Sequence, residues 1–194
     1  MNTLKAEKRD MTVKAKKLRR EGYVTGNVFG KEMEGSMPLK IAKQDAEKLM
    51  KSRGKGSRIL LDVEGKIMNV LVKEIDYDAM KNHILEMDFQ ALVKGEKVNS
   101  VAEVVLLNHE SVTDGVIQLY LTEIPYRAVP EALVEKVEID VSQMRAGDYV
   151  LVKDLDIAKN KDIEIGLDME TPVMDIMEVR TAPEEEEAEE AAEE

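Results

Sequence analysis

The sequence predicts a mainly β protein, and three observations support that class. Short runs of β-branched and apolar residues recur along the chain and are broken by Gly and Pro turns. A single short segment, 43–51, has clear helical periodicity. Aromatic residues make up 4% of the chain and Trp is absent, so the core must be built from Val, Ile, Leu and Met. We expect an N-terminal small β-barrel with short helices, a second mostly β domain, and a disordered acidic tail.

Charge is divided unevenly along the 194 residues, whose net charge is −12. Residues 1–93 carry a net charge of +5 and residues 94–194 a net charge of −17. This asymmetry predicts two regions with different tasks. We place a first domain at 1–93, a second at 94–180, and a tail at 181–194, where repelling glutamates have nothing to bury.

The first region alternates strands and turns around that one clear helix. We expect strands at 1–10, 23–30, from Leu39, at 58–63, 66–75 and 82–93, and the helix at 43–51. Glu64-Gly65 predicts a tight hairpin turn, because Gly supplies the positive φ that such a turn needs. The basic segment 12–21 is open to two interpretations: a short helix ended by Gly22, or an extended loop.

The second region repeats the strand pattern. Strands are predicted at 101–107, 116–121, 133–141, 149–152 and 174–179, and short helical turns at 141–145 and 153–158. Turns are predicted at Ile124-Pro125, Val129-Pro130 and 146–148.

Several function classes are disfavoured. The chain has no Cys, and its two histidines, His83 and His109, fall in different domains, so we expect no metal, no cofactor and no catalytic nucleophile of the cysteine type. The Gly54–Ser57 segment resembles a phosphate-binding loop only faintly, because the spacing of that motif is missing. No apolar run approaches the ~20 residues that span a bilayer. We therefore expect a cytoplasmic protein that is not an enzyme and has no membrane or small-molecule partner.

One dense basic stretch needs an explanation on an acidic chain. Residues 1–20 hold eight Lys and Arg and two acids, and the core of the stretch is Lys14–Arg20. Such a stretch is either an ordinary solvated face or a site for a polyanion such as nucleic acid. It leads into a strand interrupted by Gly26 and Gly30, a pattern typical of close backbone approach.

Several segments, taken in order, resemble one family over nearly the whole chain. They are Leu4–Arg9, Leu18–Gly30, Met87–Gln90, Val129–Glu131, Val137–Ser142, Gly147-Asp148 and Val152–Leu155. Together they resemble bacterial large-subunit ribosomal protein twenty-five in its long two-domain form, the general stress protein CTC type. The resemblance implies a structural component of the large ribosomal subunit that binds 5S ribosomal RNA through its N-terminal barrel, on the ribosome in the cytoplasm.

The same resemblance implies an RNA-binding set on the barrel. Its members are Arg9, Lys14, Lys16, Lys17, Arg19, Arg20, Phe29, Lys73, Glu86 and Asp88. Three positions depart from the family pattern: Thr25 replaces Pro, Phe29 replaces Tyr, and Glu86 replaces His. The Phe loses a hydroxyl hydrogen bond worth about 1 kcal/mol, and the Glu brings negative charge toward RNA. The alternative function is therefore a diverged, stress-associated interaction protein on the same fold, with weakened or lost binding of 5S RNA.

Overall fold

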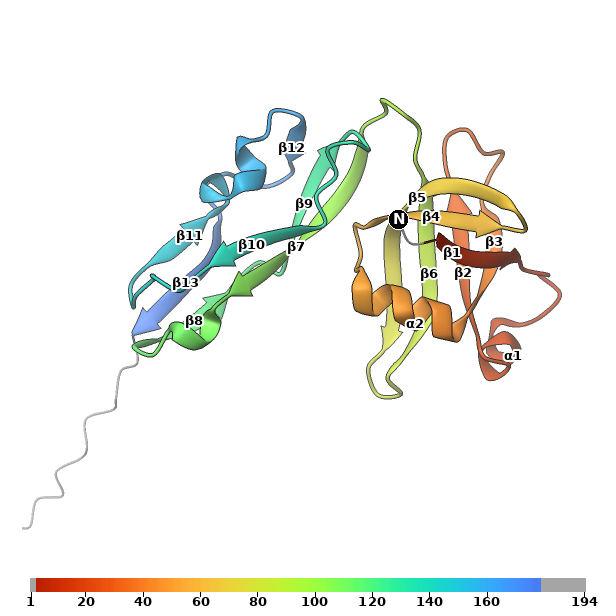
Figure 1. The fold of residues 1–194 in the computed structure, drawn as a ribbon, viewed down its shortest axis with the longest axis horizontal. Helices are drawn as coiled ribbons and strands as arrows, with labels where there is room; N and C mark the ends of the chain where they lie inside the picture. Colours follow the sequence, from red (N-terminus) through yellow and green to blue (C-terminus); the bar gives the residue numbers. More distant parts are fainter. Residues whose placement is uncertain (1–2, 179–194) are drawn as a thin grey trace, which may run out of the picture.

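The computed structural model describes residues 3–178 of the chain. It is mainly β, as predicted, with a barrel followed by a second β region (Figure 1). The predicted acidic tail, 181–194, lies outside the described residues.

Six strands close into the N-terminal barrel in the order β1-β3-β2-β6-β5-β4. They are β1 (Thr3–Lys8), β2 (Tyr23–Phe29), β3 (Met37–Ala42), β4 (Arg58–Val63), β5 (Lys66–Asp78) and β6 (His83–Ala91). Neighbouring strands are antiparallel except for the pairs β1–β4 and β2–β6, which are parallel. Alternate residues point inward, so Val, Leu, Ile and Met side chains fill the barrel around Phe89, as the composition requires.

Two helices accompany the barrel. The basic segment forms α1 (Ala15–Arg20), and α2 (Lys43–Ser52) buries Ala46 and Leu49, so the basic segment is a helix rather than an extended loop. Gly22 follows α1 with a φ of 87°, a value that ends a helix at little cost only for glycine. In the described part of the chain, no helix is long and apolar enough to cross a membrane.

The second region packs two sheets around a shared core. One sheet has the order β10-β7-β9-β12, from β7 (Val98–Leu107), β9 (Glu123–Ala128), β10 (Lys136–Asp140) and β12 (Ile163–Ile165). The other has the order β11-β13-β8, from β8 (Gly115–Leu119), β11 (Tyr149–Leu151) and β13 (Pro172–Glu178). Short 3-10 turns complete it: η1 (His109–Ser111), η2 (Val152–Asp154) and η3 (Asp156–Lys159).

Some predictions for this region were wrong. The turn predicted at Ile124-Pro125 lies inside β9, where Ile124 is buried and Pro125 pairs with Val101. Pro125 is exposed in this strand. A rule that treats Pro as a turn residue therefore fails to predict the strand. The segment 141–145 holds a single turn, in which the Met144 N–H donates to the Val141 carbonyl at 3.1 Å, and no helix, whereas 153–158 falls within 3-10 turns.

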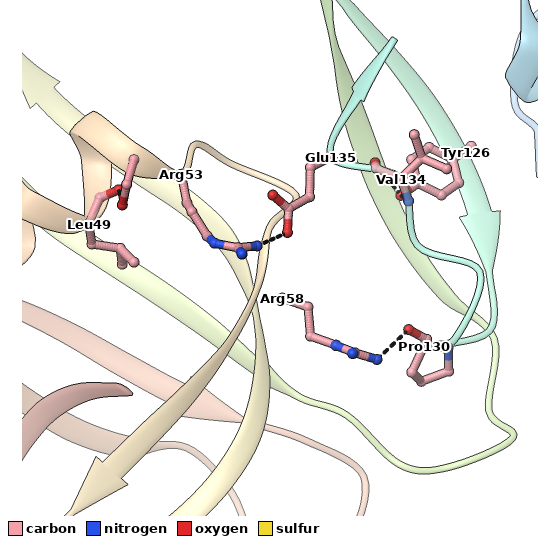
Figure 2. A network of polar contacts seen from close by, with 8 residues as sticks. Leu49, Arg53, Arg58, Tyr126, Pro130, Val134 and Glu135 are labelled. Carbon is pink, nitrogen blue, oxygen red and sulfur yellow. Dashed lines mark hydrogen bonds and ion pairs between the residues drawn. The ribbon is translucent and has the colours of Figure 1, made fainter. Parts of the chain in front are cut away.

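The two regions contact each other through the loop between α2 and β4. Lys55 Nζ lies 2.9 Å from Glu123 Oε2. Figure 2 shows Arg53 paired with Glu135, and Arg58, the first residue of β4, donating to the carbonyl of Pro130 at 3.1 Å. In the sequence, this loop bears only a faint likeness to a phosphate-binding motif. Instead, the cations of this loop are already paired within the chain.

Candidate nucleic-acid interface

The exposed cations of the predicted RNA-binding set gather on α1. Lys14 precedes the helix, Lys16, Lys17 and Arg20 are exposed on it, and Leu18 is buried and anchors it. Figure 1 shows α1 on the side of the barrel remote from the second region. Four cations therefore face solvent on a surface that the second region leaves uncovered.

Arg19 points the other way. Its Nε donates to the carbonyl of Leu85 at 3.1 Å, and one terminal nitrogen donates to Thr25 Oγ1 at 3.4 Å. Thr25 Oγ1 in turn donates to the same carbonyl at 3.3 Å. Leu85 is skipped where the register of β5 and β6 shifts, so this carbonyl lies outside the regular ladder. Arg19 thus fastens α1 to β6, and Thr25 contributes a hydroxyl that the Pro of the family pattern would lack.

Asn27 organises the two predicted acidic residues. Its backbone N–H and its Nδ2 donate to Asp88 Oδ1 at 3.1 and 3.2 Å, and Nδ2 also lies 3.3 Å from Glu86 Oε1. Asn27 and Asp88 are opposite each other in the parallel pair β2–β6. The structure therefore brings Glu86 and Asp88 together and fixes them against β2.

Two further carboxylates that sequence reasoning missed lie beside them. Glu74 pairs across the strands with Asp88, and Asp76 pairs with Glu86, so that all four line an open hollow of about 280 Å³, here called the acidic hollow. The alternation of acidic residues at 74 and 76 was the available signal. Like charges directly opposite each other on a sheet are destabilising, so these pairs lower the stability of the barrel. Among residues 3–178 no group of side chains is arranged to hold a metal ion.

Lys73 is not part of this face. It sits at a register shift of β5, and its Nζ donates to the carbonyl of Asn99 in the second region at 2.8 Å. Burial, followed by the nearby charge of Lys55, lowers the pKa of the Lys73 ammonium. The bulge turns its side chain toward the junction between the two regions.

The last two members of the predicted set lie on β2 and after β1. Phe29 is half-buried on β2, opposite Gln90 of β6. Arg9 donates to the carbonyl of Val13 at 3.3 Å, and its Nε is buried without a hydrogen-bond partner among the described residues. Arg9 thus holds the loop that leads into α1.

The glycine at position 26 serves packing between strands. A Cβ there would lie 2.1 Å from the carbonyl oxygen of Met87, so only glycine lets β2 approach β6 this closely. The predicted close backbone approach is therefore present, and the neighbour is a strand.

Comparison with known proteins decides the family. The model of the Ribosomal L25p family matches residues 4–89, and the model of Ribosomal protein TL5, C-terminal domain, matches residues 97–180. The chain belongs to the ribosomal L25p family. It is accordingly a ribosomal protein and not an enzyme. These matches confirm the family predicted from the sequence.

Named relatives agree over most of the chain. "Large ribosomal subunit protein bL25" of Enterococcus faecalis is 31% identical, covering 88% of this chain and 84% of the relative. The protein of the same name from Caldanaerobacter subterraneus is 29% identical, covering 96% and 94%. That of Listeria monocytogenes is 30% identical, covering 90% and 84%. The match thus spans the barrel and the second region together.

Proposed function

We propose that this chain is the large-subunit component that binds 5S ribosomal RNA through α1 and the adjoining face of β2 and β6, on ribosomes in the cytoplasm. Membership of the L25p family and relatives named as large-subunit proteins support the ribosomal part of this proposal. The 5S RNA partner rests on the resemblance of the sequence to this family, and the site rests on the chain's own geometry.

One observation carries the site: α1 holds exposed cations and is fastened to β6 by Arg19. Because the helix is held, Lys14, Lys16, Lys17 and Arg20 present a pre-organised set of charges to phosphates. Each phosphate neutralised changes the slope of log K against log salt by about −0.7 to −0.9. Carboxylates in the adjacent acidic hollow repel phosphate, so the phosphate contacts fall on the cations of α1.

A binding experiment tests this proposal. Labelled 5S RNA is titrated with the full chain at 50 to 300 mM KCl, and a transfer RNA serves as the specificity control. We expect affinity to fall steeply with salt, and Lys16→Ala with Lys17→Ala to flatten the slope by about 1.5.

Lys48→Ala is the matched control, because Lys48 is an exposed cation on the other helix, α2. We expect it to leave the slope unchanged. Absence of binding at 50 mM KCl, or equal losses from the α1 and α2 variants, would refute the proposed site.

A further inference from the structure

The second region exposes an aromatic and apolar surface on its three-stranded sheet. Tyr149 of β11 pairs with Asp175 of β13, while Met177 of β13 pairs with Val116 of β8. The exposed fractions are 64% for Tyr149, 59% for Val116 and 49% for Met177, and Tyr120, just after β8, is 47% exposed. These five residues form what is here called the tyrosine patch, and all of them except Val116 line an open hollow of about 810 Å³.

Asp175 lies in this surface with an incomplete set of partners. The hydroxyl of Tyr120 donates to its Oδ2 at 2.9 Å, which orients the carboxylate. Its Oδ1 is shielded from solvent and has no hydrogen-bond partner among residues 3–178. A shielded carboxylate oxygen without a donor is costly, so a cation held in the adjoining hollow stabilises this carboxylate.

The charge around the patch selects the kind of partner. Asp175 and Glu178 are the charged residues that line the hollow, and both are acidic. Across residues 94–178 there are 18 Asp and Glu against eight Lys and Arg. This field repels nucleic acid and attracts basic protein segments.

We propose that the tyrosine patch docks an extended, arginine-containing segment of a partner protein. The guanidinium lies against the rings of Tyr120 and Tyr149 and next to the carboxylate of Asp175, because arginine combines stacking on aromatic faces with a permanent positive charge. Apolar residues next to the arginine cover Val116 and Met177. This surface is separate from α1 and does not depend on the proposed binding of RNA.

A titration followed by amide NMR shifts tests the docking. The ¹⁵N-labelled full chain is titrated with acetyl-Gly-Val-Arg-Val-Gly-amide in 50 mM NaCl. We expect shifts confined to β8, β11 and β13. The same peptide with citrulline, the neutral isostere of arginine, should bind at least tenfold more weakly.

Variants of the tyrosine patch and an RNA oligonucleotide test the proposal further. Asp175→Asn and Tyr149→Ala should each weaken binding of the arginine peptide at least fivefold. Glu138→Gln, on the exposed side of the other sheet, should leave this binding unchanged. Unchanged binding in both patch variants, equal binding of the citrulline peptide, or no shifts with 5 mM peptide would overturn the proposal. Shifts of these strands by an RNA oligonucleotide instead of the peptide would assign the patch to nucleic acid and also overturn it.

Discussion

Asn27 and Asp88 lie opposite each other on parallel strands, and two donors of Asn27, its backbone N–H and its Nδ2, converge on the single oxygen Asp88 Oδ1. The same amide also lies 3.3 Å from Glu86. One asparagine thus fixes both acidic residues that the sequence had placed on the RNA-binding face. Their carboxylates are oriented before any RNA arrives, so a change of charge at either should alter binding with little change in shape.

Replacing Glu86 by glutamine should strengthen binding of 5S RNA. The substitution keeps the length and the acceptor for Asn27 but removes a negative charge from the acidic hollow. Two unit charges 4 Å apart in water interact by about 1 kcal/mol, so we expect roughly fivefold tighter binding at low salt. Titration of labelled 5S RNA measures it, with Glu138→Gln as the distant control. Weaker binding by Glu86→Gln would mean that the carboxylate itself accepts hydrogen bonds from the RNA.

Arg19 should contribute more to stability than its neighbour Arg20 does. Arg19→Ala leaves the Leu85 carbonyl and the Thr25 hydroxyl short of a donor, at a cost of about 1 to 3 kcal/mol in the free energy of unfolding. Arg20→Ala removes an exposed cation, so the free energy of unfolding should change by less than about 0.5 kcal/mol. The salt dependence of RNA binding should become less steep in this variant. Urea unfolding of both variants checks the first effect. Equal stabilities would show that the Arg19 contacts do not hold the helix.

The close approach of β2 and β6 makes Gly26 intolerant of a side chain. Gly26→Ala puts a methyl group 2.1 Å from the Met87 carbonyl oxygen, and overpacking of this kind typically costs about 1 to 3 kcal/mol and occasionally more. Gly65→Ala is the control, since nothing lies within 4 Å and only its φ of 90° opposes the substitution. Thermal unfolding should therefore rank Gly26→Ala as the less stable variant, and the reverse order would contradict the close approach.

Contact between the barrel and the second region depends on another glycine. Gly56→Ala places a Cβ 2.0 Å from the Val101 carbonyl oxygen, whereas Gly54→Ala meets only a Glu103 oxygen at 3.8 Å. We expect Gly56→Ala to loosen the junction, so that ¹⁵N relaxation gives the two regions different rotational correlation times. Gly54→Ala should leave one shared correlation time. Identical relaxation in both variants would show that the loop does not join the regions.

Alkaline pH should weaken the second region through Tyr126. Burial raises the pKa of this phenol, whose hydroxyl donates to the Val134 carbonyl and accepts from the Val134 N–H, both at 2.8 Å. Because the folded pKa exceeds the unfolded value of about 10, the stabilisation is complete below that pH and is lost as the pH rises through the folded pKa. Tyr126→Phe should cost about 1 to 3 kcal/mol at neutral pH and reduce the alkaline decrease, measured by urea unfolding between pH 7 and 11. An undiminished alkaline decrease in Tyr126→Phe would contradict this assignment.

Local patterns predicted the elements that depend on local chemistry. The hairpin at Glu64-Gly65 is one case, with φ values of 52° and 90° at the two turn residues. Strand β9 was missed because Pro125 reads as a turn, although its outward position in the sheet tolerates it. Sequence order also gave no sign that β2 and β6 pair in parallel, since this pairing joins residues about 60 positions apart.

The positions of some candidate RNA-binding side chains could be predicted from the sequence, whereas their contact with RNA stays a prediction. The exposed cations of α1 follow from composition and helix geometry. The directions of Lys73 and of the Leu85 carbonyl follow from register shifts in β5 and β6, and alternation alone does not show where a shift occurs. The family resemblance placed both Lys73 and Arg19 in the RNA-binding set, and the register shifts that direct Lys73 and the Leu85 carbonyl could not be located beforehand.

Photo-crosslinking measures most directly whether α1 contacts the RNA. Lys17 is replaced by p-benzoylphenylalanine in one protein and Lys48 by the same residue in another, and each is irradiated with 5S RNA. Both positions are exposed, one on α1 and the other on α2. The proposed interface predicts a protein–RNA crosslink from position 17 and none from position 48. Crosslinking from position 48 alone, or equal yields from both positions, would contradict it.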